Sequence, residues 1–319
     1  MKIAILDDYQ DCVRTLACFG RLAGHDVQVL NETIADPQAL AARLSGVQAL
    51  VLIRERTKLS RELISLLPEL RIVSQTGRAG NHIDLDACNE RRIVVAAGSG
   101  SPYAPAELAW ALVLAASRGV AHEAAMLRAG RWQTMLGRTL RGRTLGELGY
   151  GNIGRLVAGF GRAFGMRVLA FGREGSIARA QADGMRTAPS RRALFEASDV
   201  LSVHLRLAPE TRGGISREDL QAMPEGGLFV NTSRAELVAP GALLGALDAG
   251  RPAMAAIDVF DAEPTVNDPL IAHPRVLATP HIGYVERDSY EMYLGTAFDI
   301  VLAFAAGKPA GVVNPEALG

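Results

Sequence analysis

Residues 144–173 read TLGELGYGNIGRLVAGFGRAFGMRVLAFGR, and this stretch decides the fold of the chain. A short apolar run ends in Gly149, Gly151 and Gly154, which have the GxGxxG spacing. The residues that follow carry apolar side chains at helical intervals, and a second apolar run covers 167–171. The pattern predicts a strand, a tight turn, a helix and a second parallel strand.

The three glycines have separate physical roles in such a turn. The first permits the turn, the second lets the backbone approach a pyrophosphate, and the third lets helix and strand pack closely. The pyrophosphate then lies on the free amides at the helix N-terminus. The spacing also fits an ordinary strand-to-helix turn, but the second parallel strand favours a dinucleotide site. Its predicted cofactor-binding residues are Gly149, Tyr150, Gly151, Asn152, Ile153 and Gly154.

The composition indicates a globular protein that acts on a small molecule. Among 319 residues, 34 are basic and 34 acidic, so we expect neither a nucleic-acid partner nor a membrane partner. Nearly all basic residues are arginine, which makes a single arginine weak evidence for an anion site. The three cysteines form no CxxC pair, so we expect no metal site and a reducing, cytoplasmic environment. The N-terminal MKIAILDDYQ does not resemble a signal peptide.

Short β-branched runs alternate with helical patterns along the chain. Runs at 2–6, 26–30, 49–53, 71–74 and 93–96 predict a flavodoxin-like parallel layer of five strands. Runs at 200–205, 228–232, 254–259 and 276–278 join the glycine motif in a six-stranded doubly wound sheet. We also expect an apolar helix at 106–118, started by Pro105, and a long final helix at 288–306.

The predicted fold is therefore α/β, with two Rossmann-like doubly wound parallel-sheet domains and a cleft between them. The expected substrate domain comprises residues 1–98 and 286–319. The expected NAD(P)-binding Rossmann domain comprises residues 99–285.

Three motifs lie near the ends of the later strands: NTSRAE (231–236), AAIDVFDAEP (255–264) and TPHIGY (279–284). Two further motifs are GRAGNHIDL (77–85) and SVHLRLAPETRGGI (202–215). With these, the chain resembles the D-isomer-specific 2-hydroxyacid dehydrogenase family over almost its full length. That family includes phosphoglycerate dehydrogenase and glyoxylate/hydroxypyruvate reductase. Such a combination in one order is far more specific than GxGxxG alone.

The resemblance implies hydride transfer between a nicotinamide cofactor and a small 2-keto or D-2-hydroxy acid. His281 is the implied general acid/base, and Glu263 accepts a hydrogen bond from its other ring nitrogen. Arg234 is implied to hold the substrate carboxylate and to polarise the carbonyl. Alternatively, His281 caps a helix, Glu263 belongs to a turn and Arg234 reflects composition. The joint presence of the three in this order favours catalysis.

Further cofactor contacts implied by the resemblance are His204, Thr232 and Asp258. Asp258 would face the nicotinamide amide, although a strand-end cap is an alternative interpretation. His204 lies inside a strand run, so we expect it in the core or behind the site rather than at the chemistry.

The end of the second strand of the glycine motif bears on the choice between NAD and NADP. An NAD enzyme places an acidic residue there to accept from the ribose hydroxyls. Here the position holds Gly172, followed by Arg173, which can pair with a 2′-phosphate. We predict a preference for NADP over NAD, with the adjacent Glu174 as the residue that could restore an acid.

The family binds the substrate carboxylate through main-chain amides of one loop in the first domain. The implied substrate-binding residues are Arg54, Gly77, Arg78, Ala79 and Gly80. Arg78 and Ala79 stand where the family often has an apolar residue and a glycine, and a surface role for either arginine is the alternative. Glu147 is another departure, because the family prefers Ile or Val there, and burial of an unpaired carboxylate is costly.

Two other functions compete with a dehydrogenase. The fold also serves dinucleotide-sensing, corepressor-like binding proteins without significant turnover, and an inactive structural paralogue is a third interpretation. Formate dehydrogenases of the family carry glutamine beside the histidine, so Glu263 favours hydroxy-acid chemistry. Homodimerisation through the cofactor domain is an expectation from the family.

Overall fold

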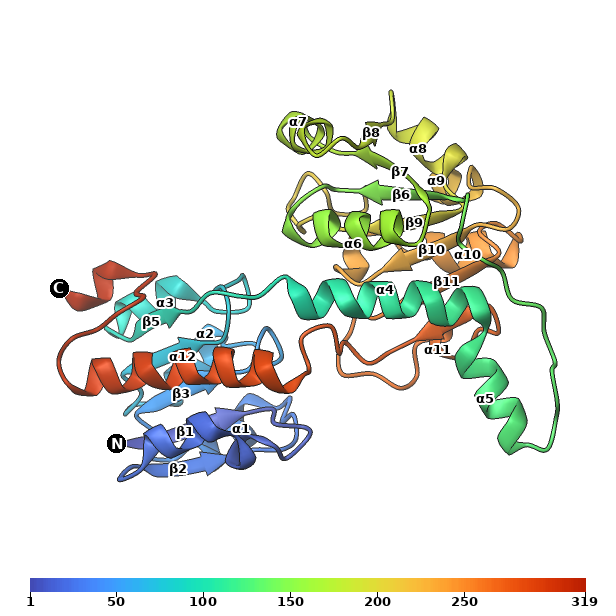
Figure 1. Cartoon of the computed structure of the whole chain (residues 1–319). Coiled ribbons are helices and arrows are strands. Elements are labelled where there is room, and N and C mark those ends of the chain that lie inside the picture. The colour runs from blue at the N-terminus through green and yellow to red at the C-terminus, as the bar shows by residue number, and fades with distance from the viewer. The chain divides into compact units, whose positions relative to one another are not determined.

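The computed structural model describes residues 1–319, which form two compact units. One comprises Met1–Ser101 and Val285–Gly319, and the other comprises Pro102–Tyr284 (Figure 1). Each unit contains its own parallel sheet, covered by helices on both faces.

The first unit is built on a five-stranded parallel sheet with the order β2-β1-β3-β4-β5. This is the flavodoxin-like order. The strands are almost wholly apolar because helices cover both faces of the sheet. Their bounds are β1 (Lys2–Leu6), β2 (Asp26–Val29), β3 (Ala49–Leu52), β4 (Ile72–Gln75) and β5 (Val94–Ala97).

Helices of the first unit divide between the two faces of this sheet. One face shares an apolar cluster with α1 (Pro37–Arg43), α2 (Arg61–Ser65) and α3 (Leu85–Glu90). On the other face, α12 (Arg287–Ala305) packs against β3, β4 and β5. Ser74 of β4 fixes that contact, because its hydroxyl donates to the carbonyl of Ala297 at 2.9 Å.

Polar side chains determine where several of these helices begin. Asp36, Ser60 and Asp84 each accept a hydrogen bond from a backbone amide of the first turn of α1, α2 and α3. Glu286 accepts from the amides of Asp288 and Ser289 at the start of α12.

The second unit is built on a seven-stranded parallel sheet with the order β12-β11-β10-β9-β6-β7-β8. Counted from β6, this is the Rossmann order 3-2-1-4-5-6 with one further strand at the edge. The bounds are β6 (Thr144–Leu148), β7 (Arg167–Phe171), β8 (Arg186–Thr187), β9 (Val200–Val203), β10 (Leu228–Asn231), β11 (Met254–Ile257) and β12 (Val276–Ala278). The seventh strand was not expected, because the two residues of β8 are too few to show a pattern.

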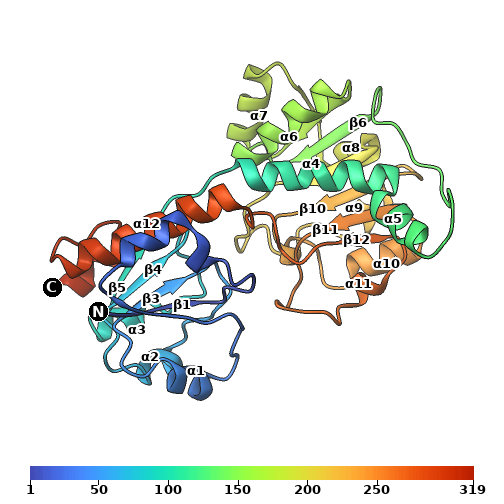
Figure 2. The same cartoon turned by 60° about the horizontal axis from the view of Figure 1, so that its bottom comes forward.

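The helices of the second unit also pack on both faces, as Figure 2 shows for the central part of the sheet. One apolar cluster joins α4 (Tyr103–Arg118), α6 (Asn152–Ala163) and α7 (Glu174–Ala182) to the sheet. The opposite cluster joins α8 (Arg191–Ala197), α9 (Arg217–Gln221), α10 (Ala242–Asp248) and α11 (Pro269–Ala272). Four short 3-10 helices cover Val13–Thr15, Ala17–Leu22, Ala235–Leu237 and Pro315–Leu318.

Two helices differ from the expectation. α4 begins at Tyr103 rather than at Ala106, because Pro105 lies in its first turn, where no intrahelical amide donor is needed. After the left-handed Gly119, the chain forms α5 (Val120–Arg128), which the sequence did not indicate. This helix has only nine residues and none of them is buried, so its short apolar pattern did not indicate a core-facing helix.

Candidate active site and dinucleotide-binding turn

The turn between β6 and α6 has the backbone that the glycine spacing predicts. Gly149 has φ +100°, and a Cβ there would lie 2.7 Å from the carbonyl oxygen of His204. A Cβ on Gly154 would lie 2.4 Å from the carbonyl oxygen of Gly149, so helix and turn touch through this glycine. Gly151 faces open space. No side chain caps α6, so its first amides are available to an anion and the turn fits a pyrophosphate.

The side chains around this turn contribute little to it. The ring of Tyr150 is buried, and its hydroxyl donates to Asp183 at 3.0 Å, which leaves only the main chain of Tyr150 at the turn. Burial, followed by the hydrogen bond to Asp183, raises the pKa of Tyr150 to about 12. Asn152 is exposed, and Ile153 packs partly against the apolar cluster under α6.

The end of β7 carries no carboxylate at the position where the ribose is expected. Gly172 follows the strand, and Arg173 is the N-cap residue of α7 with an exposed side chain. Glu174 is exposed in the first turn of that helix. Thr232, another predicted cofactor contact on this edge of the sheet, is half-buried directly after β10.

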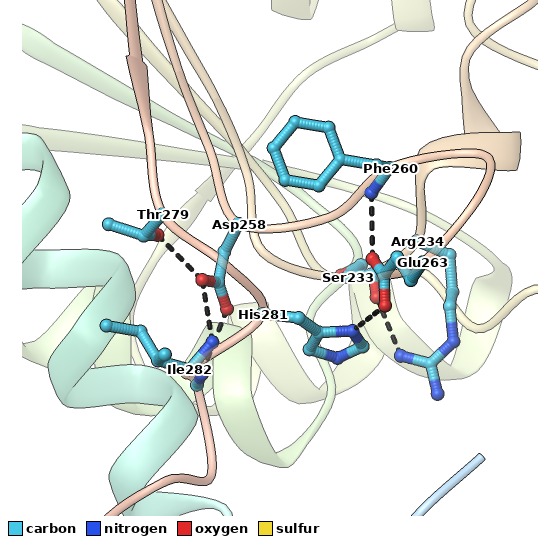
Figure 3. Close-up of polar contacts among 9 residues, drawn as sticks. Ser233, Arg234, Asp258, Phe260, Glu263, Thr279, His281 and Ile282 are labelled. Atoms are coloured by element: carbon cyan, nitrogen blue, oxygen red, sulfur yellow. Dashed lines mark hydrogen bonds and ion pairs between the residues drawn. The ribbon is translucent and has the colours of Figure 1, made fainter. Parts of the chain in front are cut away.

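His281 and Glu263 form a hydrogen-bonded pair (Figure 3). The distance from His281 Nδ1 to Glu263 Oε2 is 2.5 Å, and the side chains are 28% and 32% exposed. The other carboxylate oxygen of Glu263 accepts the amide of Phe260 at 2.8 Å. Burial acts to raise the pKa of Glu263, but hydrogen bonds from His281 and Phe260 and the charges of His281 and Arg234 hold it below its ordinary value.

This carboxylate fixes which nitrogen of the imidazole can exchange a proton. Because ionised Glu263 can only accept, His281 Nδ1 is the donor and Nε2 is left for proton exchange with a ligand. His281 has φ +51°, and its ring lies edge-on to Tyr284 with centroids 5.7 Å apart.

Asp258 organises the loop that carries His281. Its carboxylate accepts the Thr279 hydroxyl at 2.6 Å and the amides of Ile282 and Gly283 at 2.8 and 2.9 Å. Burial raises the pKa of Asp258, against the opposing influence of these hydrogen bonds and of the His281 charge. The family motif placed Asp258 near the cofactor, whereas nothing in the sequence indicated that it bridges both sides of His281.

Arg234 follows β10 in a turn held by the polar residues before it. The side-chain amide of Asn231 donates to the carbonyl of Arg234 at 2.9 Å, and its oxygen accepts the amide of Ser233 at 3.0 Å. The Ser233 hydroxyl donates to the carbonyl of Val203 in β9 at 2.7 Å. In Figure 3 the Arg234 guanidinium extends on the same side of the chain as the His281 imidazole. A group that can bind an anion and a group that can exchange a proton therefore lie together.

In the first unit, Arg54 lies against the predicted carboxylate-binding loop. A Cβ on Gly77, which has φ +76°, would lie 2.1 Å from Arg54 Nη1. The backbone of Arg54 has φ +57°; its amide donates to Thr76 Oγ1, and its carbonyl accepts Gln75 Nε2, both at 2.8 Å. Of the other loop residues, Arg78 is exposed, and Ala79 packs partly against the core.

His204 and Glu147, which the sequence left without a connection, are neighbours. His204 Nε2 lies 3.2 Å from Glu147 Oε2, and both side chains are buried. His204 is therefore behind the glycine turn rather than beside His281.

A dinucleotide turn, a carboxylate-oriented histidine and an arginine in one Rossmann unit define a nicotinamide-dependent oxidoreductase. Comparison with known proteins gives the family. The profile of the D-isomer specific 2-hydroxyacid dehydrogenase family, NAD binding domain, matches residues 110–283. The chain belongs to this family, and it is an oxidoreductase of 2-hydroxy acids.

Several relatives resemble the chain over most of its length. It is 36% identical to the glyoxylate reductase of Aeropyrum pernix, over 92% of this chain and 90% of that protein. A crystal structure of an oxidoreductase from Ralstonia solanacearum is 54% identical, with a TM-score of 0.98, and covers 100% of this chain and 98% of that one. The D-3-phosphoglycerate dehydrogenase of Bacillus subtilis is 31% identical, and the matched region is 54% of its length.

The structure contains neither a metal-binding cluster nor a membrane-spanning helix. No cluster of three or more His, Cys, Asp or Glu side chains is arranged to bind a metal ion. None of the helices combines the length and the apolar character needed to cross a membrane.

Proposed function

We propose that the chain reduces a small 2-keto acid to the D-2-hydroxy acid, and catalyses the reverse reaction, with His281 as the general acid/base. The His281–Glu263 pair carries this proposal, because the carboxylate orients the ring and leaves Nε2 for proton exchange with a ligand. His281 Nε2 donates a proton to the carbonyl oxygen during reduction and accepts it during oxidation. The nicotinamide dinucleotide supplies or accepts the hydride. Arg234 binds the substrate carboxylate and polarises the carbonyl.

The test is oxidation of NADH and NADPH by purified protein with glyoxylate, hydroxypyruvate, pyruvate or 2-ketoglutarate, and the reverse assay with 3-phosphoglycerate. His281→Ala is expected to lower kcat/KM at least about 100-fold. His273→Ala is the matched control, because His273 also faces a carboxylate, Asp248, at 3.5 Å in the same unit. Dinucleotide binding without turnover on any of these substrates would instead support the corepressor-like function.

We propose that NADP is preferred over NAD. Gly172 presents no carboxylate that would repel a 2′-phosphate, and the Arg173 side chain is exposed beside it. We expect kcat/KM to be higher with NADPH than with NADH, and Gly172→Asp to shift the ratio at least about 10-fold toward NADH. A clear NADH preference of the unchanged protein would contradict the proposal and assign the ribose contact to Glu174.

We propose that the loop of residues 77–80 and Arg54 hold the anionic end of the substrate. Arg54 adds a cation directly against Gly77, which suits a substrate with a second anionic group such as a phosphate or carboxylate. Gly77→Ala is expected to displace the guanidinium and raise KM about 10-fold with little change in kcat. Gly46→Ala is the control, because Gly46 has a similar φ of +74° and its Cβ would meet no atom closer than 3.8 Å. Equal KM changes in both variants would show that only backbone strain is involved.

We propose that the chain forms a homodimer through α5 and the segment that follows it. Large apolar side chains are exposed there: Val120 at 56%, Leu127 at 59%, Trp132 at 76% and Leu136 at 96%. The segment is held in place, because Glu123 accepts the amides of Thr134 and Met135 at 2.9 and 2.8 Å. Such a preformed apolar surface is typical of an interface. Sedimentation is expected to show a dimer that Trp132→Asp weakens; a monomeric native protein would refute the proposal.

A further inference from the structure

A carboxylate and an imidazole lie buried together beneath the glycine turn. Glu147 is in β6, at the centre of the sheet, and pairs in register with Ser202 of β9. His204 is two residues after Ser202 and follows the end of β9 directly, so continued alternation places its side chain on the same face of the sheet. The Oε2 atom of Glu147 is 3.2 Å from Nε2 of His204, and their side chains are 0% and 2% exposed.

The chain supplies few other partners for these two groups. The Ser202 hydroxyl lies 2.9 Å from the same Nε2 atom of His204. Neither carboxylate oxygen of Glu147 has a well-formed hydrogen bond, and His204 Nδ1 has no partner in the chain. Each group is therefore the main electrostatic partner of the other.

The elements packed around the pair bring no other buried charge to it. α4, α6 and α7 contribute apolar side chains to this face, and the charged residues of these helices, such as Glu107, Arg155 and Arg179, are exposed. Tyr150 from the turn is the other titratable group nearby, and its hydroxyl donates to Asp183. The protonation of the pair is therefore set by the pair itself and by whatever binds at the turn.

His204 is in contact with the turn that receives the pyrophosphate. A Cβ on Gly149 would lie 2.7 Å from the carbonyl oxygen of His204. A Cβ on Gly154 would lie 3.3 Å from Cδ2 of the imidazole. The imidazole thus packs directly beneath the turn and beside the start of α6, where an anion is favoured by the helix dipole.

Two arrangements of the same protons are open to the pair. In one, Glu147 is a carboxylic acid and His204 is a neutral imidazole. In the other, the proton has moved from Glu147 Oε2 to His204 Nε2, which leaves a carboxylate and an imidazolium with no change in net charge. Burial favours the neutral arrangement, whereas a pyrophosphate above the imidazole favours the charged one. In agreement, burial raises the pKa of Glu147, against the opposing influence of His204.

We propose that Glu147 is a positioning residue for dinucleotide binding, which protonates His204 when the turn is occupied so that an imidazolium lies beneath the pyrophosphate. The proposal rests on the dinucleotide site and not on the proposed substrate or on His281. Its tests are therefore binding and spectroscopy, which remain informative if every keto acid fails as a substrate.

The first test is titration of NADH and NADPH into Glu147→Gln by calorimetry. Glutamine keeps the shape and can hydrogen-bond to the imidazole, but it has no acidic proton to transfer. We expect Kd to rise about 10-fold, an effect comparable to that of a partly buried charge at a helix end. Asp199→Asn is the control for lost stability, because it breaks the 3.2 Å ion pair with Arg143 at the opposite end of β9. An unchanged Kd in Glu147→Gln, or an equal rise in both variants, would overturn the proposal.

The second test needs only the native protein labelled with ¹⁵N-histidine. The chain has six histidines, and the signal absent from His204→Asn identifies His204. We expect one protonated ring nitrogen without dinucleotide and two with it, and no such change in Glu147→Gln. A His204 signal that is identical with and without dinucleotide would refute the proton transfer, even if Glu147→Gln did not fold.

Discussion

Replacing Glu263 with glutamine should lower the rate of keto-acid reduction. Glu263 is ionised near neutral pH, because its pKa is held below its ordinary value, and it accepts a hydrogen bond from His281 Nδ1 at 2.5 Å. A hydrogen bond to a charged group contributes about 1.5–3 kcal/mol, and about 1.4 kcal/mol in the barrier changes the rate tenfold. The two side chains are 28% and 32% exposed, so solvent screening favours the lower end. We expect kcat/KM at neutral pH to fall about 10-fold.

The assay is kcat/KM for the best keto acid at neutral pH, measured for the native protein, Glu263→Gln and Asp248→Asn. Asp248 is the matched control, because it forms another histidine–carboxylate pair of this unit, with His273. An unchanged kcat/KM in Glu263→Gln, or an equal loss in Asp248→Asn, would refute the reasoning that this carboxylate holds the imidazole for reaction.

The same substitution should also change how the free energy of unfolding depends on pH. The pKa of Glu263 is lowered in the folded chain, so its stabilising contribution is present above the unfolded pKa of about 4.3 and is lost as pH falls through the folded value. Urea unfolding should therefore show a larger difference between the native protein and Glu263→Gln at neutral pH than in acid. A difference that is independent of pH would contradict the assigned hydrogen bond.

Two further substitutions test the glycine turn and the loop that carries His281. Gly154→Ala should lose most of its dinucleotide affinity and about 1–3 kcal/mol of stability, because the new Cβ would lie 2.4 Å from the carbonyl oxygen of Gly149. Gly159→Ala is the control on the same helix. Its Cβ would lie in open space, so this variant should bind the dinucleotide normally in the same titration. Asp258→Asn should lower the free energy of unfolding by about 1.5–3 kcal/mol and reduce turnover, because one oxygen that accepts from the loop around His281 becomes a donor. Unchanged urea midpoints for Asp258→Asn would show that the loop does not depend on this carboxylate.

The strands of both sheets could be predicted because buried parallel strands are continuous apolar runs bounded by turn residues. The same physics explains what was missed. α5 is a nine-residue helix with no buried residue and β8 has two residues, so neither gave a pattern strong enough to predict it. The order of motifs along the chain predicted His281, Glu263 and Arg234 as site residues, but the contacts of Asp258 are with a loop more than twenty residues away. Likewise, no local pattern joins Arg54 to Gly77.

The pairing of Glu147 shows why the sequence alone left this residue unexplained. Taken by itself, Glu147 did not fit a central strand, because an unpaired carboxylate at the centre of a sheet is costly. In the Rossmann order the strand of the glycine motif neighbours the fourth strand, which is β9 once the two-residue β8 is counted. Nothing in the sequence indicated β8, so the run at 200–205 stood third and its place beside the motif could not be inferred. With the order known, alternation through the end of β9 places Ser202 and His204 on one face, and the register places Glu147 opposite Ser202. A carboxylate and a histidine that each break the apolar pattern of neighbouring strands are therefore best interpreted together, as one buried pair whose net charge is zero.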